Sequence, residues 1–218
     1  MCRGAGQRRL AGEPIAPMRG SPFPTMAAAS STPAPLMTLD AACELAQKIL
    51  DMLRDQNKTW DANLFRGAEC FVSYAERDGV VYRQDKRSST ERPMRAEASK
   101  ICLRMKVNGQ LSNQFGTMHG GCLATIVDTC SSFLTLLHSS GVAGEPWSMM
   151  GVTQALIVQY LKPTHVGKWI EVETTMRSIS KTLCLLHVNI YELDGRDGQR
   201  TAHTVTGSHN KMDIRPKL

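Results

Sequence analysis

The sequence predicts an α+β fold, an antiparallel sheet covered on one face by one long apolar helix. First, "GCLATIVDTCSSFLTLLHSS" has the apolar spacing of a helix that ends near Gly141. Second, one strand pattern precedes this helix and four follow it. Third, consecutive strands joined by short turns form an antiparallel meander, and the apolar face of a meander needs a cover. The helix is long enough to supply it.

Residues 1–37 are expected to form a disordered tail, because they are rich in Gly, Pro, Ala and Ser and lack hydrophobic periodicity. Four arginines against one acid, Glu13, give the tail half of the formal charge of +6. A mitochondrial presequence is therefore one alternative. The prolines argue against an amphipathic helix there, and Met26 and Met37 leave room for a later start.

Residues 38–99 are expected to hold an N-terminal helix and an irregular extension. "TLDAACELAQKILDMLRDQ" repeats apolar residues at helical spacing. "CFVSYAERDGVVYRQD" is typical of a hairpin that turns at Asp78-Gly79. "KRSSTERPMRAEAS" has the composition of an exposed charged loop.

From residue 100 onward the strand patterns are clear. The segment before the long helix alternates apolar and polar residues, and the four after it are rich in β-branched residues or alternate in the same way. The predicted strands are "KICLRMKV", "GVTQALIVQYL", "KWIEVETTMRSI", "KTLCLLHVNIYEL" and the more polar "QRTAHTVTGSHNKM".

Composition excludes several classes of protein. The charge of +6 comes without a long Lys/Arg run or interleaved aromatic residues, so nucleic acid is not an expected partner. No apolar run reaches membrane-spanning length. The seven cysteines form no C-x-x-C pair, which indicates reduced thiols and an intracellular protein. Neither the cysteines nor the histidines have metal-ligand spacing, so no metal is expected.

The long helix has two different faces. Its sheet-packing stripe consists of Leu123, Ile126, Val127, Cys130, Phe133, Leu134 and Leu137. Asp128 lies on the opposite face with Ala124, Ser131, Ser132 and Thr135. These residues are too small for an ordinary charged surface and suit close approach by another subunit or a substrate. A carboxylate there has either a hydrogen-bonded structural role or a role as a base.

The residues that open this helix, "HGG", favour the second role. Two glycines at a helix start allow close backbone approach, and their N–H groups lie at the positive end of the helix dipole. Such groups stabilise an oxyanion or polarise a carbonyl. Combined with an acid two turns later, they form a candidate pair of electrophile and base.

Two motifs resemble those of a known family. "NQFGTMHGGCLATIVD" resembles the signature of the hotdog-fold acyl-CoA thioesterases, in the branch of the phenylacetate-pathway enzymes and the small mammalian enzyme. "YLKPTHVGKWIEV" resembles the family's next landmark. The resemblance covers about residues 100–212. It implies a hotdog domain over 100–213, with the sheet wrapped around the central helix, and hydrolysis of acyl-coenzyme A without a cofactor.

The resemblance also implies roles for particular residues. The Gly120 N–H and Asn113 would polarise the thioester carbonyl, and Asp128 would activate water with help from Thr153. His119 would lie in the site without transferring a proton. Asp128 would face Gly120 and Asn113 of the partner subunit in a homo-oligomer, either a dimer or a dimer of dimers. Coenzyme A would contact Tyr160, Ser180, Lys181 and Thr182. Relatives usually have glycine at position 180.

Several alternatives stay open. His119 suits a helix cap, Thr153 an ordinary strand residue, and Lys181 a solvated turn residue. The chain could be a non-catalytic hotdog module that binds acyl-CoA or scaffolds an assembly, although a binder has no need of Asp128. A hotdog hydratase usually carries a catalytic histidine that "CLATIVDT" lacks. The acyl group is not readable from the sequence, and the compartment is either the cytoplasm or the mitochondrion.

Overall fold

A computed structural model describes residues 34–55, 59–84 and 99–214 of the chain. Most of the expected tail and nearly all of the expected charged loop lie outside these ranges. The helices are α1 (Leu39–Asp55), α2 (Ala62–Phe65), the 3-10 turn η1 (Gly109–Leu111) and α3 (Gly120–Leu136). The strands are β1 (Cys70–Arg77), β2 (Val80–Arg83), β3 (Lys100–Lys106), β4 (Val152–Tyr160), β5 (Trp169–Ile179), β6 (Leu183–Leu193) and β7 (Arg200–Met212).

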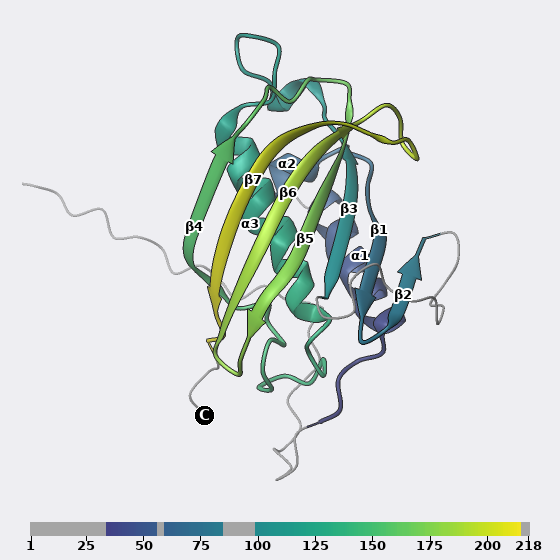
Figure 1. Cartoon of the computed structure of the whole chain (residues 1–218), viewed down its shortest axis with the longest axis vertical. Coiled ribbons are helices and arrows are strands. Elements are labelled where there is room, and N and C mark those ends of the chain that lie inside the picture. Colours follow the sequence, from purple (N-terminus) through teal and green to yellow (C-terminus); the bar gives the residue numbers. More distant parts are fainter. Residues whose placement is uncertain (1–33, 56–58, 85–98, 215–218) are drawn as a thin grey trace, which may run out of the picture.

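The strands form one antiparallel sheet in the order β2-β1-β3-β5-β6-β7-β4, with α3 and α1 on the same face (Figure 1). The predicted α+β fold is confirmed, and β5, β6 and β7 form the expected meander. The prediction was wrong for β4, which pairs with β7 instead of β5. Because β3 already pairs along β5, β4 crosses to the far edge of the sheet.

The long helix packs as the apolar spacing predicts. All seven residues of its sheet-packing stripe are buried in one core with β3, β5, β6 and α1. The helix ends at Leu136, earlier than the expected end near Gly141. A short turn follows, and the guanidinium of Arg77 donates to the Leu137 carbonyl, which satisfies an acceptor that the helix end leaves open.

The predicted N-terminal helix and hairpin are also present. Asp78 and Gly79 both have positive φ, 53° and 77°, which suits a two-residue hairpin turn. The sheet continues across residue 100, because β1 pairs with β3. Gln47 of α1 binds the β1 backbone on both sides, accepting from the Val72 N–H and donating to the Cys70 carbonyl. Within the described ranges, no helix is long and apolar enough to cross a membrane.

Candidate active site around Asp128 and the N-terminus of α3

The small polar face of α3 is partly buried by the chain itself. Ser131, Ser132 and Thr135 are buried, whereas the Asp128 side chain is 43% exposed. His209 of β7 contacts Ser131, and Lys211 of β7 contacts Ser132. The expectation that this whole face meets another subunit or a substrate was therefore wrong for its C-terminal half. β7 covers that half, and only the part near Asp128 is open.

Asp128 is bound through one oxygen only. The Thr153 hydroxyl donates to Oδ1 over 2.6 Å, and His209 Nε2 lies 3.2 Å from the same oxygen. His209 Nε2 is also 3.0 Å from the Thr153 hydroxyl. No described residue donates to Oδ2 of Asp128. The cluster thus fixes the orientation of the carboxylate and leaves one acceptor oxygen open.

The contacts of His209 define its tautomer. The Thr153 hydroxyl gives its one proton to Asp128, so it can only accept from His209, which therefore carries a proton on Nε2. Nδ1 then accepts from the Ser131 hydroxyl over 2.5 Å. Burial, and secondly the charge of Lys211, lower the pKa of His209 from 6.5 to about 4, against the opposing effect of Asp128. His209 is neutral at pH 7 and acts here as a donor.

Lys211 is a second charged residue behind Asp128. Its side chain is 3% exposed, and Nζ donates to the Ser132 hydroxyl over 2.7 Å. Ser132 in turn donates to the Asp128 carbonyl over 2.7 Å. Burial lowers the pKa of Lys211, and the Asp128 carboxylate opposes that shift. Lys211 therefore closes the buried side of the cluster as a donor to Ser132.

His209 and Lys211 were not predicted as site residues from the sequence. Both lie on β7 at alternate positions, two residues apart, so they face the same side of the sheet. Their signal was a histidine and a lysine at inward positions of a strand, where apolar residues are usual. This pattern identifies the two residues only when the register of β7 is known, because the register decides which side chains of the strand point toward α3.

A second set of groups lies at the N-terminus of α3. His119 is the N-cap, and its Nδ1 accepts from the Gly121 N–H over 3.0 Å, as the capping alternative predicted. The Gly120 N–H donates to no described residue. Gly120 lines a cavity of about 340 Å³ together with Leu123, Tyr160 and Leu161. A residue with an open N–H at a helix start thus lines this cavity, and such a helix start is suited to bind a polarised oxygen.

Asn113 and Tyr160 shape the same end of the site. Asn113 Oδ1 accepts from the N–H groups of Phe115 and Thr117, and its Nδ2 donates to the Thr117 hydroxyl, so Asn113 also organises the loop before the helix. The Tyr160 hydroxyl donates to the Gly120 carbonyl over 2.8 Å. A Cβ at Gly120 would lie 3.4 Å from the Tyr160 ring, an ordinary van der Waals distance, so this contact does not itself require glycine.

The predicted coenzyme A segment forms the β5–β6 turn. The Ser180 hydroxyl accepts from the N–H groups of Thr182 and Leu183. Ser180 is not among the residues with positive φ, so the backbone of this turn does not require a glycine at that position. Lys181 is exposed at the apex and has no ion-pair partner among the described residues.

The predicted site residues fall into two groups that lie apart within one chain. Asn113, His119, Gly120 and Tyr160 lie at one end of α3 and β4. Asp128 and Thr153 lie further along the same two elements. The 180–182 turn is close to this second group, because Leu183 and Val152 both pair with Met212. Asp128 is about 12 Å along the helix from Gly120 at 1.5 Å per residue. Thr153 is about 23 Å along the strand from Tyr160 at 3.3 Å per residue.

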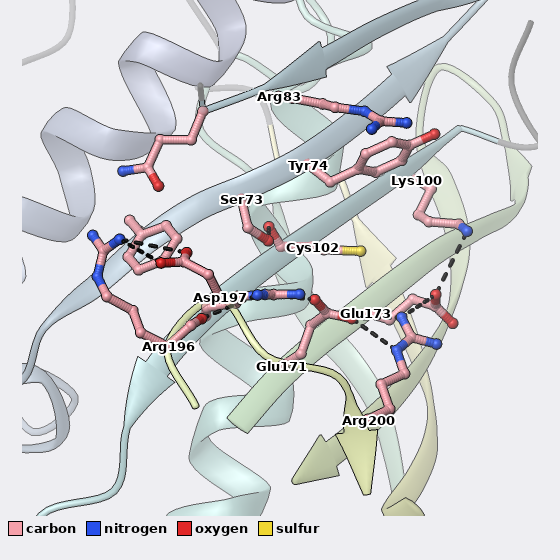
Figure 2. Close-up of a pocket in the computed structure, with 13 residues that line it drawn as sticks. Ser73, Tyr74, Arg83, Lys100, Cys102, Glu171, Glu173, Arg196, Asp197 and Arg200 are labelled. Atoms are coloured by element: carbon pink, nitrogen blue, oxygen red, sulfur yellow. Dashed lines mark hydrogen bonds and ion pairs between the residues drawn. The ribbon is translucent and has the colours of Figure 1, made fainter. Parts of the chain in front are cut away.

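A hollow of about 830 Å³ lies on the other face of the sheet (Figure 2). Glu171 accepts from Arg104 and Arg200, and Glu173 pairs with Arg200 and Lys100. Burial opposes ionisation of Glu173, but Arg200 and Lys100 outweigh it and lower the pKa. Because cations already bind both carboxylates, this hollow is lined by a saturated ion-pair network.

Metal ligation has no candidate in the part of the chain that the structure describes. No three or more His, Cys, Asp and Glu side chains there are placed to hold an ion.

The chain is similar to known thioesterases in sequence and in fold. Residues 115–199 match the family described as the Thioesterase superfamily. Acyl-coenzyme A thioesterase 13 of Mus musculus is 30% identical over 95 residues, which cover 44% of this chain and 63% of that protein. The Homo sapiens protein of the same name gives the same identity and coverage.

Two solved structures share the fold over most of the described chain. Zebrafish thioesterase superfamily member 2 aligns with a TM-score of 0.54 and 19% identity, over 79% of this chain and 98% of that one. The Mus musculus protein of that name aligns with a TM-score of 0.51 and 19% identity, over 78% and 96%. The hotdog fold expected from the motifs is confirmed, and so is the resemblance to the thioesterase family.

Proposed function

Since the chain carries a Thioesterase superfamily segment in a hotdog fold, we propose that it hydrolyses the thioester of acyl-coenzyme A to a free acid and coenzyme A. The observation that carries this proposal is the state of Asp128. Its Oδ1 is held by Thr153 and His209, while Oδ2 is open and the side chain is 43% exposed. A carboxylate that is oriented on one side and open on the other suits a general base.

In the proposed reaction, Asp128 Oδ2 accepts a proton from water while the water oxygen attacks the thioester carbonyl carbon. The carbonyl becomes an oxyanion, and its collapse breaks the carbon–sulfur bond and releases coenzyme A as the thiolate. Thr153 and His209 donate toward Oδ1 and keep Oδ2 aimed outward. Base catalysis of this kind contributes about 10²–10⁴-fold.

The oxyanion would be stabilised at the N-terminus of α3. His119 occupies the Gly121 N–H, which leaves the Gly120 N–H as a donor at the positive end of the helix dipole. One such donor typically contributes about 10²–10³-fold. Asn113 would add a side-chain donor if its amide turned from Thr117 toward the substrate.

A complete site would need two subunits, because Gly120 and Asp128 are about 12 Å apart on one helix. β4 offers the contact surface. It is an edge strand of the sheet and exposes Val152, Ile157 and Tyr160, each by 44% or more. Exposed apolar edge strands pair readily with another strand. Antiparallel pairing of two β4 strands about their centres would bring Thr153 next to Tyr160 of the partner subunit. The assembly would be a dimer or a dimer of dimers.

Complementation between two inactive variants tests the shared site. Asn113→Ala and Asp128→Ala should each be inactive alone. Co-refolded in equal amounts, about half of the dimers should be mixed, and each mixed dimer has one intact site. The mixture should recover about a quarter of wild-type activity per site. No recovery, with mixed dimers seen by native mass spectrometry, would reject the two-subunit site.

Coenzyme A would be held by Tyr160 and by the turn of Ser180, Lys181 and Thr182. Lys181 supports this, because neither its ammonium nor its N–H binds another described residue, and both can donate to a phosphate. Release of free thiol from acetyl-, phenylacetyl-, medium- and long-chain acyl-CoA would identify the acyl group. Tight binding without thiol release would favour the non-catalytic module instead.

We place this activity in fatty-acid metabolism, in the cytoplasm or in the mitochondrion. The Arg-bearing composition of residues 1–37 supports the second location, and their prolines support the first. A reporter fused to residues 1–37 should reach isolated mitochondria only if the segment is a presequence.

A further inference from the structure

The loop between α3 and β4 is built around the indole of Trp147. Trp147 is 2% exposed and has a φ of 62°, a region that bulky residues rarely adopt. Gly151 has a φ of 66°, and a Cβ there would lie 2.6 Å from the Met212 carbonyl oxygen and 3.0 Å from Trp147 Cζ3. The backbone of the loop therefore has positive φ at Trp147 and Gly151, and the indole of Trp147 is buried under the loop. Such backbone conformations concentrate at functional sites.

The indole contacts the turn that carries Lys181. Trp147 Nε1 donates to the Ser180 carbonyl over 2.9 Å. From its other end the turn is held by the Asp213 N–H, which donates to the Thr182 carbonyl over 2.9 Å. The residue between these two anchors is Lys181, whose own N–H and ammonium are open. The turn is thus fixed at both sides of an exposed cation.

We propose that Trp147 is a positioning residue that fixes the 180–183 turn, so that Lys181 meets the phosphates of coenzyme A in a prepared geometry. This inference rests on the proposed function. A lysine on a loose turn loses backbone freedom when it binds a phosphate, whereas a lysine on a fixed turn has lost it already. Trp147 would therefore affect the affinity for the nucleotide end of the substrate and leave the Asp128 chemistry unchanged.

Kinetics of Trp147→Phe on two substrates test this role. Phenylalanine keeps an aromatic ring and removes the N–H donor. For acyl-CoA, KM should rise about twofold to fivefold with kcat unchanged, the range of one exposed charge contact. For the matching acyl-pantetheine, which lacks the nucleotide and its phosphates, KM should not change. Trp60→Phe is the control, because Trp60 is 78% exposed and no described hydrogen bond joins it to the turn.

Comparison with Lys181→Met completes the experiment. Lys181→Met should raise KM for acyl-CoA at least as much as Trp147→Phe, and the double variant should be no worse than Lys181→Met alone. An unchanged KM in either single variant, or an equal rise for acyl-pantetheine, overturns the inference. Failure of the proposed function looks different, because the wild-type protein would then release no thiol from any acyl-CoA.

A measurement on the wild-type protein covers the case in which Trp147→Phe does not fold. The chain has three tryptophans, so the indole N–H signals of 15N-labelled protein can be assigned with Trp60→Phe and Trp169→Phe. The Trp147 signal should shift when coenzyme A is added and stay in place with pantetheine. A signal unmoved by saturating coenzyme A overturns the inference.

Discussion

Two polar clusters occupy opposite faces of the same sheet, and they differ in how completely their charges are used. On the outer face, cations bind Glu171 and Glu173 on both sides, and Glu171 is 6% exposed (Figure 2). On the helix face, Asp128 has contacts through Oδ1 alone. A saturated ion pair stabilises or specifies a structure, whereas an oriented carboxylate with an open oxygen can accept a proton. Whether each carboxylate oxygen already has a partner therefore distinguishes the candidate catalytic cluster from the structural one better than burial or cavity size does.

The largest expected effect comes from Asp128→Asn. Asparagine preserves the size of the side chain and one acceptor oxygen, but it cannot take a proton from water. We expect kcat to fall about 10²–10⁴-fold with little change in melting temperature. Steady-state thiol release and thermal denaturation measure the two quantities. Near wild-type turnover would mean that Asp128 is not the base.

The matched change on the outer face is Glu171→Gln. It leaves Arg104 and Arg200 without a full counter-charge, so the free energy of unfolding should fall by about 3 kcal/mol. Because Glu171 lies on the far side of the sheet, kcat should stay within about twofold. Urea denaturation and thiol release measure these quantities. A loss of kcat without a loss of stability would reverse our assignment of the two clusters.

The buried histidine gives the helix-face cluster a pH dependence. Its pKa is about 4 in the folded protein and 6.5 in the unfolded chain. Between these values the unfolded chain binds a proton that the folded protein does not, so the free energy of unfolding falls as the pH falls from about 6.5 to 4. The total loss should be about 3 kcal/mol. His209→Gln should lack that part of the slope, and parallel curves for both proteins would contradict it.

The smallest effect is expected from Thr153→Val, which removes the hydroxyl between Asp128 and His209. The carboxylate loses its shortest donor and part of its orientation, so kcat should fall about tenfold, which corresponds to one hydrogen bond to a charged group. Thr153→Ser keeps the hydroxyl and should stay near wild type. Equal activity of the two variants would mean that Thr153 is an ordinary strand residue.

The parts of the fold that follow from local sequence were predicted well. The apolar stripe of α3, the hairpin turn at Asp78-Gly79 and the alternation in β5 and β6 each depend on residues a few positions apart. The placement of β4 was predicted wrongly, because pairing between Val152 and Met212 joins residues far apart in the chain. Local alternation carries no information about which strand is the neighbour.

The candidate site divides in the same way. "NQFGTMHGG" and Asp128 were singled out from their motif and helix position. His209 and Lys211 were missed because their inward direction depends on the register of β7 beneath α3. His119 shows the opposite case, since a histidine directly before two glycines is enough to suggest its contact with the Gly121 N–H.

The position of β7 between β6 and β4 has a consequence for protein synthesis. β4 leaves the ribosome before β7, and its one partner in the described sheet is β7. Until Arg200–Met212 has been translated, β4 has no neighbouring strand in the described sheet, and Asp128 has no histidine behind it. A nascent chain that stalls before Arg200 would expose the two strand edges that β7 pairs with in the folded protein, one on β6 and one on β4. Such a chain would be a strong substrate for ribosome-associated chaperones and would aggregate without them.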